Sequence, residues 1–301
     1  MIISKCPLRV SLVGGSTDLQ SFINEYGYGS VISFPISLYT YITISKRFDR
    51  FYQIDYSSQE SLINPNKIKN DIARELILYF NLPPITISFN ADIPTTGSGL
   101  AASSSYMIAA IAAACKFKGL EWSQEKICRI AHEIELKFNP LTGYQDTYGC
   151  GLPSPKLMKF NKKGDVDIQF IDLPECKMFL YNTNGVRSST DILKTIDIEK
   201  SFPLLELVDK VYNNLNDPDQ FFKLLRDAWE TKKKTSKDIL SDDFLVKLDK
   251  QMTSEPEVNF HKLCGAGGGG YFLIMAEDSF SNPGLKINPN IDNKGVTVWE
   301  I

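Results

Sequence analysis

The stretch Pro94-Thr-Thr-Gly-Ser-Gly-Leu-Ala-Ala-Ser-Ser-Ser105 is the most informative part of the sequence, because it places a run of small residues between a predicted strand and a predicted helix. The strand is expected at residues 85–89, where apolar and hydroxyl-bearing side chains alternate, and the alanine-rich helix ends before Gly119. A helix N-terminus has unpaired N–H groups and a partial positive charge, and small side chains let a phosphate come close to that backbone. The stretch therefore predicts an anion cradle, and a helix start that only packs tightly on a sheet is the alternative.

Two glycine-rich segments share the spacing of a dinucleotide-binding turn. Gly97-x-Gly99-x-x-Ala102 fits that fingerprint, but the acidic residue required about 20 positions later would fall where a helix and the loop 118–122 are predicted. The segment Cys264-Gly-Ala-Gly-Gly-Gly-Gly270 leads into the predicted strand 271–275, whereas a dinucleotide turn leads into a helix. A nicotinamide-dependent dehydrogenase is therefore disfavoured. The chain has no Gly-Lys or Asp-Phe-Gly sequence, which excludes a Walker A loop and the protein-kinase pattern.

Composition excludes several classes of protein. The 301 residues carry 33 basic and 36 acidic side chains, so no overall charge favours nucleic acid or an anionic membrane as a partner. The 6 cysteines are scattered without a Cys-x-x-Cys pair, which disfavours a zinc site and indicates a reducing compartment. The longest apolar run, Tyr106 to Cys115, is about half a membrane span, and residues 1–10 lack the pattern of a signal peptide. We expect a cytoplasmic protein that handles any anionic ligand at a local site.

The order of the predicted elements divides the chain into two lobes. The first part is rich in predicted strands, and the part between Asp191 and Met252 is mostly helical. A change of composition near residue 165 gives lobes 1–165 and 166–301. The other elements expected from pattern and caps are strands 8–13, 30–36, 39–45, 156–160, 166–171 and 271–275, a helix at 66–79, and a helix from a Ser123 cap to about Phe138.

Two charged residues far apart in the sequence are candidates for work on a substrate. Asp146, in Gly143-Tyr-Gln-Asp146, is expected in a turn, where a carboxylate can accept a proton from a hydroxyl; an aspartate that only caps the turn is the alternative. Arg9 lies inside an apolar strand, and a buried charge there needs a partner. Either a phosphate or Asp146 would supply it.

The helix 123–138 holds two glutamates that its geometry separates. Glu133 lies four residues from a basic side chain on either side, which predicts a solvent-facing row of charges. Glu135 shares its face with Cys128 and Ala131, so it faces a less polar surface. Glu135 is therefore the better metal-ligand candidate, and a half-exposed carboxylate on the helix flank is the alternative.

Basic residues in the second half of the chain receive two interpretations. Lys232 to Lys234 are expected to be a solvated helix end. Arg187, in Gly185-Val-Arg-Ser-Ser-Thr190, lies among hydroxyl-bearing residues after a predicted strand, so it either clamps a substrate phosphate or is simply exposed.

The chain resembles the GHMP kinases in three segments, Pro7–Asp18, Pro94–Ser105 and Gly143–Asp146, which occur in the same order and at similar separations. This superfamily includes galactokinase, homoserine kinase, mevalonate kinase and phosphomevalonate kinase. With the segments Gly185–Leu193 and Gly265–Phe272, the chain is most similar to the heptose 7-phosphate kinases among them. The resemblance implies a two-lobed α+β fold, with an N-terminal α/β lobe like a ribosomal-protein domain, a ferredoxin-like C-terminal lobe, and the nucleotide between them.

The resemblance also implies an activity and its partners. The implied enzyme is an ATP- and Mg²⁺-dependent sugar kinase that phosphorylates the anomeric hydroxyl of D-glycero-D-manno-heptose 7-phosphate to the 1,7-bisphosphate, toward GDP-heptose and surface polysaccharide. Its partners would be a small sugar phosphate and ATP, with no nucleic acid and no membrane. Nothing in the pattern predicts an oligomeric state.

Residue roles follow from the matching positions. Asp146 would face the acceptor hydroxyl with Arg9 as its electrostatic neighbour, and Ser103 and Glu135 would hold the metal ion. The glycine turn 265–270 would pack beside the phosphate loop. The ATP phosphates would be held by Gly97, Ser98, Gly99, Leu100, Ala101, Ala102, Ser103 and Ser104, and the sugar by Gly15, Ser16, Thr17, Asp18, Arg187, Gly267 and Gly268.

The chain departs from the family pattern in the phosphate loop. The family usually reads Gly-Leu-Gly-Ser-Ser, whereas this chain reads Gly99-Leu-Ala-Ala-Ser103, and Thr96 is an extra residue. The two alanines support one alternative, a catalytically silent member that binds a sugar phosphate. Another anomeric sugar kinase, for example one acting on fucose, is the second alternative.

Overall fold

The structure is a computed structural model that describes residues 1–185, 189–282, 285 and 287–301. Its larger sheet has the strand order β11-β1-β2-β5-β3-β4, with β6 paired to β2 and β7 paired to β6. The long strand β2 pairs with β6 along residues 28–33 and with β5 along residues 40–46. The strands are β1 (Ile2–Val13), β2 (Tyr28–Lys46), β3 (Tyr52–Asp55), β4 (Gln59–Leu62), β5 (Ile85–Ala91), β6 (Lys156–Asn161), β7 (Val166–Phe170) and β11 (Thr297–Glu300).

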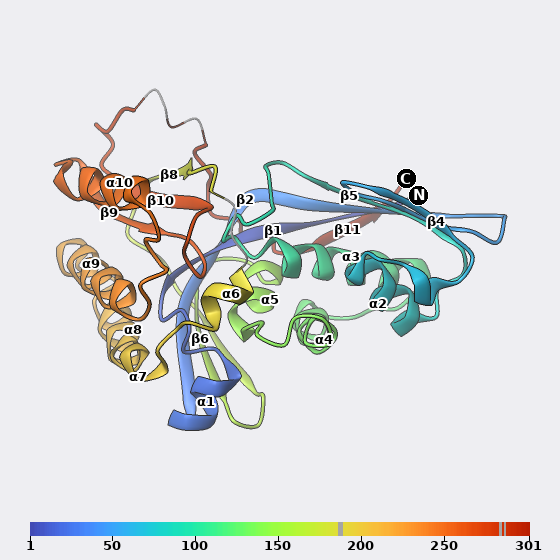
Figure 1. Ribbon diagram of the computed structural model, residues 1–301, viewed down its shortest axis with the longest axis horizontal. Coiled ribbons are helices and arrows are strands. Elements are labelled where there is room, and N and C mark those ends of the chain that lie inside the picture. Colours follow the sequence, from blue (N-terminus) through green and yellow to red (C-terminus); the bar gives the residue numbers. More distant parts are fainter. Residues whose placement is uncertain (186–188, 283–284, 286) are drawn as a thin grey trace.

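Helices cover one face of this sheet, below the strands in the view of Figure 1. The central helix is α3 (Ala102–Lys118), which is apolar on nearly every side because it packs on β1 and β2 and between α2, α4 and α5. A helix that is apolar all round has to be buried in this way. The surrounding helices are α2 (Asp71–Phe80), α4 (Gln124–Glu135) and α5 (Tyr144–Gly151), with α1 (Gln20–Tyr26) beside β2.

A second, smaller lobe contains an antiparallel sheet in the order β8-β10-β9 with helices packed on it (Figure 1). One apolar core runs through both lobes, because Leu8 of β1 and Phe34 of β2 belong to the same cluster as Val208, Trp229 and Phe260. The elements are β8 (Lys177–Asn182), β9 (Val258–Leu263), β10 (Tyr271–Ala276), α6 (Ser189–Leu193), α7 (Ile198–Ser201), α8 (Pro203–Asn213), α9 (Pro218–Lys234) and α10 (Asp243–Ser254).

The structure corrects several element boundaries. The strands expected at 30–36 and 39–45 are the single strand β2, and residues 37 and 38 lie at a register shift in its ladder with β1 between Pro7 and Leu8. The helix expected from residue 66 begins at Asp71, where the Asn70 side chain accepts a hydrogen bond from the Ala73 N–H, and a short 3₁₀ turn precedes it. The predicted Ser123 cap is confirmed, since its hydroxyl accepts from the Lys126 N–H.

The lobe boundary at residue 165 stays a prediction, and strands beyond it contribute to the larger sheet. Residue 165 lies in the turn between β6 and β7, and β7 pairs with β6. The last strand, β11, pairs with β1. Within the described residues no helix combines the length and apolar character needed to cross a bilayer.

Candidate active site

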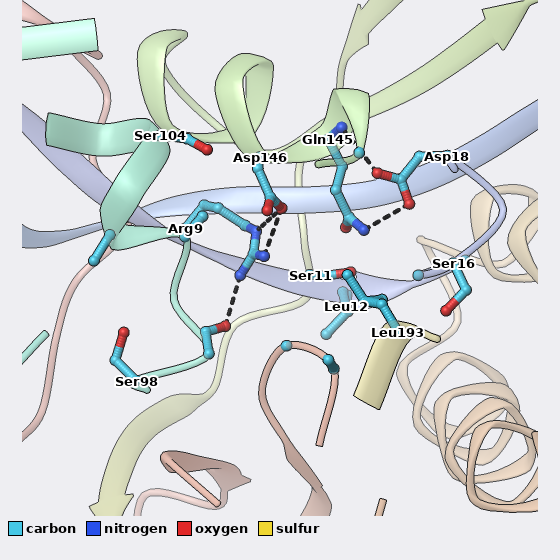
Figure 2. Close-up of a pocket in the computed structure, with 18 of the residues that line it drawn as sticks. Arg9, Ser11, Leu12, Ser16, Asp18, Ser98, Ser104, Gln145, Asp146 and Leu193 are labelled. Carbon is cyan, nitrogen blue, oxygen red and sulfur yellow. Dashed lines mark hydrogen bonds and ion pairs between the residues drawn. The ribbon is translucent and has the colours of Figure 1, made fainter. Parts of the chain in front are cut away.

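A cavity of about 380 Å³ lies where the two lobes meet (Figure 2). The larger lobe contributes the end of β1, the loop 95–101, the start of α3 and the start of α5. The smaller lobe contributes α9, β9 and the turn after β9. Segments from both lobes thus surround one space.

The loop 95–101 reaches the cavity through an unusual backbone path. Gly97, Gly99 and Ala101 have φ values of +66°, +73° and +58°. A Cβ on Gly99 would lie 2.4 Å from the Cys264 carbonyl oxygen, and one on Gly265 would lie 2.6 Å from the Gly99 Cα. The predicted contact between the two glycine-rich segments is therefore confirmed, and it is a backbone-to-backbone contact that leaves no room for a side chain.

Arg9 and Asp146 form an ion pair at the centre of the cavity (Figure 2). The Arg9 Nη2 and Nε donate to Asp146 Oδ1 at 2.6 and 3.1 Å, and Nη1 donates to the Gly99 carbonyl at 2.8 Å. Of the two partners expected for the buried arginine, the structure thus shows Asp146. The aspartate lies in the first turn of α5, where a loop turn was predicted. Both bonds end on Oδ1, so Oδ2 takes no part in the ion pair.

Asp18 is a second, fully buried carboxylate beside this pair. Its Oδ1 accepts from the Gln145 side chain at 2.8 Å and its Oδ2 from the Gln145 N–H at 3.2 Å (Figure 2). Burial, and then the charge of Asp146, raise the Asp18 pKa to about 6. Nearby, the buried Ser11 hydroxyl lines the cavity and has no hydrogen-bond partner within the described residues. These groups supply hydrogen-bonding capacity that a polyhydroxylated ligand can use.

Glu135 is buried at the end of α4, with 1% of its surface exposed, whereas Glu133 is exposed. The predicted difference between the two glutamates is therefore confirmed. Ser104 Oγ donates to Glu135 Oε2 at 2.6 Å. Burial raises the Glu135 pKa to about 7, against the lowering effect of the Ser104 hydrogen bond. A buried carboxylate whose hydrogen-bond partners in the described part of the chain are neutral hydroxyl groups is a site that a cation would stabilise.

Three comparisons with known proteins show what this chain is similar to. Residues 66–153, which include the loop 95–101, Glu135 and Asp146, match the family model of the GHMP kinases N terminal domain. Over these residues the chain is similar to the N-terminal domain of the GHMP kinases, and the fold of the whole chain matches that of solved kinases. A D-glycero-alpha-D-manno-heptose 7-phosphate kinase from Campylobacter jejuni is 27% identical, over 92% of this chain and 89% of that protein.

Two further relatives cover most of this chain. A solved structure described as a D-glycero-D-manno-heptose 1-phosphate kinase from Bacteriodes thetaiotaomicron has a TM-score of 0.79 and 21% identity, and covers 100% of this chain and 99% of its own. An L-fucokinase/L-fucose-1-P guanylyltransferase from Bacteroides fragilis is 23% identical over 92% of this chain and 35% of that protein. The GHMP kinase fold is thus matched over the whole chain.

A magnesium ion fits the donor atoms at the start of α3 in this GHMP kinase fold. Glu135 and Ser104 present oxygen atoms, which Mg²⁺ prefers, and the exposed Ser103 lines the same cavity. No group of three or more His, Cys, Asp and Glu side chains within the described ranges is placed to hold a metal ion. The other ligands would thus come from phosphate oxygens and water, as is usual for Mg²⁺. Ser104 donates a hydrogen bond to Glu135, and a side-chain hydrogen bond from Ser103 also lowers the Glu135 pKa, so Ser103 as a metal ligand stays a prediction.

The predicted binding residues divide into two groups. Those that line the cavity are Gly15, Ser16, Asp18, Gly97, Ser98, Gly99, Ala101, Ala102, Ser103 and Ser104. Leu100 is fully buried beneath the loop, and the Thr17 hydroxyl is bonded to the Gly14 and Ser30 carbonyls, so neither side chain lines the cavity. Gly267 and Gly268 pack on Ile239, away from the lining. Arg187 lies outside the described residues.

The expectation for Lys232 to Lys234 is wrong for Lys232. Only 7% of the Lys232 surface is exposed, and the side chain lines the cavity. It follows Leu225, Ala228 and Trp229 at spacings of seven, four and three residues, so it lies on the buried stripe of α9. That spacing is the signal by which sequence reasoning could have found it. Lys262 of β9, also 7% exposed, lines the cavity as well and was not singled out.

Proposed function

We propose that this protein is an ATP- and Mg²⁺-dependent sugar kinase that phosphorylates the anomeric hydroxyl of D-glycero-D-manno-heptose 7-phosphate, giving the 1,7-bisphosphate. The observation that supports this proposal best is the Arg9–Asp146 ion pair, which lies beside a glycine-rich helix start in a cavity between the lobes. The name of the Campylobacter jejuni relative supports the acceptor. The reaction would supply GDP-heptose for surface polysaccharide, and we place it in the cytoplasm.

Positioning and charge are the main contributions of these residues to phosphoryl transfer. The Asp146 carboxylate accepts the proton of the acceptor hydroxyl, and Arg9 fixes the carboxylate through Oδ1. Arg9 also holds the Gly99 carbonyl, so the base and the phosphate loop share one anchor. The N–H groups at the start of α3 would bind phosphate oxygens. A bound Mg²⁺, held by Glu135 with Ser104 or Ser103, would neutralise charge on those oxygens.

The acceptor sugar would lie on the Asp18 side of Asp146. Asp18 and Gln145 are fixed by their mutual hydrogen bonds, and the Ser11 hydroxyl, which has no partner among the described residues, lines the same cavity. A preorganised set of this kind orients a substrate without having to be ordered on binding.

The experiment is a measurement of ADP release with Mg²⁺ and ATP against a panel of sugars and sugar phosphates. We expect turnover with D-glycero-D-manno-heptose 7-phosphate, and a loss of about 10²- to 10⁴-fold in kcat for Asp146→Asn. The control is Asp167→Asn on the exposed side of β7, which should leave kcat unchanged. Full turnover by a folded Asp146→Asn protein would remove Asp146 as the base.

The Bacteroides fragilis relative supports a second candidate, a 1-kinase for an unphosphorylated sugar such as fucose. The same panel separates the two candidates, because that enzyme would turn over free sugars without a phosphate group. A rise in melting temperature with ligands but no turnover of any sugar would instead show a silent sugar-phosphate-binding protein.

A further inference from the structure

Two buried lysines face the active-site cavity from the smaller lobe. Lys232 of α9 donates to Ser16 Oγ at 2.5 Å. Lys262 of β9 donates to the carbonyls of Ser11 and Leu12 at 2.8 and 3.3 Å. The two lysines are therefore hydrogen-bonded to the end of β1 or to the loop after it, and both line the cavity.

Neither lysine forms an ion pair with a carboxylate in the described part of the chain, since their hydrogen-bond partners are neutral oxygens. The next residue on α9 provides a contrast, because Lys233 pairs with Asp249 and Glu230. Burying an ammonium group without a counter-ion is costly. Burial is the main reason that the pKa of Lys232 is lowered to about 7 and that of Lys262 to about 8, and the charge of Lys262 lowers the Lys232 pKa further.

The charged groups near Lys232 and Lys262 do not neutralise the positive charge of these two lysines. Asp18 is the carboxylate that acts on Lys232, but its oxygens are bonded to Gln145. Arg9 adds a further positive charge beside Lys262, and it is committed to Asp146. The lysines therefore present positive charge to the cavity that an anionic ligand would neutralise.

The position of the lysines identifies which substrate that anion belongs to. Figure 2 shows Ser98 of the loop 95–101 and Ser104 of α3 on one side of the Arg9–Asp146 pair, and Asp18 and Ser16 on the other. Lys232 bonds to Ser16, so it lies at the end of the cavity away from that loop. An acceptor whose reacting hydroxyl meets Asp146 and whose body lies along Asp18 would bring its far end to Lys232.

We propose that Lys232 and Lys262 form an anion subsite that binds a phosphate monoester of the acceptor, at the end remote from the hydroxyl that is phosphorylated. The subsite rests on the proposed function and deepens it, because it makes the acceptor a sugar phosphate rather than a neutral sugar. Two ammonium groups, with the Ser16 hydroxyl beside them, give several donors for the phosphate oxygens.

The subsite is held in place from behind by Asp249 of α10. Asp249 Oδ1 accepts from Trp229 Nε1 at 2.7 Å and contacts His261 Nε2 at 2.9 Å, and Oδ2 pairs with Lys233 at 2.7 Å. Lys232 therefore directly precedes Lys233, and Lys262 directly follows His261, and both of these neighbours contact the Asp249 carboxylate. Such support reduces the freedom that two long side chains would lose on binding a phosphate.

The test is calorimetric binding of D-glycero-D-manno-heptose 7-phosphate, of the unphosphorylated heptose, and of ATP to the intact protein. We expect Lys232→Gln to weaken binding of the heptose phosphate about 10- to 100-fold, in line with the loss of a charged hydrogen bond. Binding of the free heptose and of ATP should stay unchanged. Lys234→Gln, on the exposed side of the same helix end, is the matched control and should bind all three like the parent.

Each outcome decides the proposal. Loss of ATP binding in Lys232→Gln would assign the lysine to the nucleotide, and an equal loss for both heptoses would show a general disturbance, so either result overturns the subsite. If Lys232→Gln does not fold, Lys262→Gln is judged by the same three ligands. Lysine-dependent binding of the heptose phosphate without any phosphoryl transfer would keep the subsite and remove the proposed kinase activity.

Discussion

Ser104 Oγ donates to Glu135 Oε2 at 2.6 Å, and this contact joins the first turn of α3 to the last residue of α4. It brings the start of α3 and the one buried glutamate of α4 to the same wall of the cavity.

The first prediction concerns the charge of Glu135. Glu135→Gln can still accept the Ser104 hydrogen bond but cannot offer a carboxylate to a cation. We expect the Mg²⁺ concentration that gives half-maximal ADP release to rise at least about 10-fold, with little change in melting temperature. Glu133→Gln, on the exposed face of the same helix, should have the parent's Mg²⁺ dependence. Identical Mg²⁺ curves for both variants would remove Glu135 from the metal site.

The second prediction concerns the left-handed backbone at Ala101, which has φ +58° and ψ +41°. A non-glycine residue in that region costs about 1 kcal/mol, so Ala101→Gly should raise the free energy of unfolding by roughly 0.5–1 kcal/mol. Ala102, the first residue of α3, is the matched control position. Ala102→Gly should lower the free energy of unfolding by about 1 kcal/mol. Urea unfolding of both variants measures this. Equal destabilisation by the two glycines would show that Ala101 is not strained.

The third prediction concerns the contact between Gly99 and Gly265. Gly265→Ala would put a Cβ 2.6 Å from the Gly99 Cα, so the phosphate loop has to move. We expect the KM for ATP to rise about 10- to 100-fold. Gly119→Ala is the control, because Gly119 has a similar φ of +67° but no atom within 4 Å of the added Cβ. The Gly119→Ala variant should lose only about 1 kcal/mol in its free energy of unfolding and keep the parent's KM for ATP. An unchanged KM in Gly265→Ala would show that the loop adapts.

The fourth prediction concerns His132, which stacks on Tyr144 with ring centroids 4.2 Å apart. Burial lowers its pKa to about 4, against the raising effect of the Asp146 charge. An unfolded histidine has a pKa of about 6.5, so between these values the unfolded chain binds more protons and stability falls as the pH falls. We expect the free energy of unfolding of the parent, relative to His132→Asn, to be roughly 2 kcal/mol lower at about pH 4.5 than at about pH 7.5.

Asp18 works in the opposite direction, because its raised pKa of about 6 makes the folded protein bind protons in the same range. Both proteins in the comparison contain Asp18, so its effect cancels in the difference. Parallel stability curves for parent and His132→Asn would contradict the assignment.

The part of the site that follows from local rules could be predicted from the sequence. Arg9 in an apolar strand required a partner, and Asp146 is that partner. The helix face separated the buried Glu135 from the exposed Glu133. Both conclusions depend on periodicity and on the cost of burying charge, which act within a few residues of each position.

The part that depends on tertiary packing could not be predicted. The Ser104–Glu135 hydrogen bond joins the start of α3 to the end of α4, a contact that no local pattern in the sequence indicates. Lys232 reaches Ser16, 216 residues away in sequence, only because α9 packs against the end of β1. The spacing along α9 indicates that Lys232 is buried, but it does not indicate that the partner of Lys232 is Ser16.

The contact between the two glycine-rich segments is made of backbone alone, and this shapes how the protein can evolve. A contact between side chains tolerates a larger residue when a smaller one replaces its neighbour. At Gly99 and Gly265 the nearest atoms are backbone atoms of the other segment, so no second substitution can remove them. A scan of all single substitutions would therefore show these glycines as positions that reject every chemical class equally. Drift in acceptor specificity would have to come from the other wall of the cavity, where the lysines and hydroxyl groups are side chains and can be exchanged one at a time.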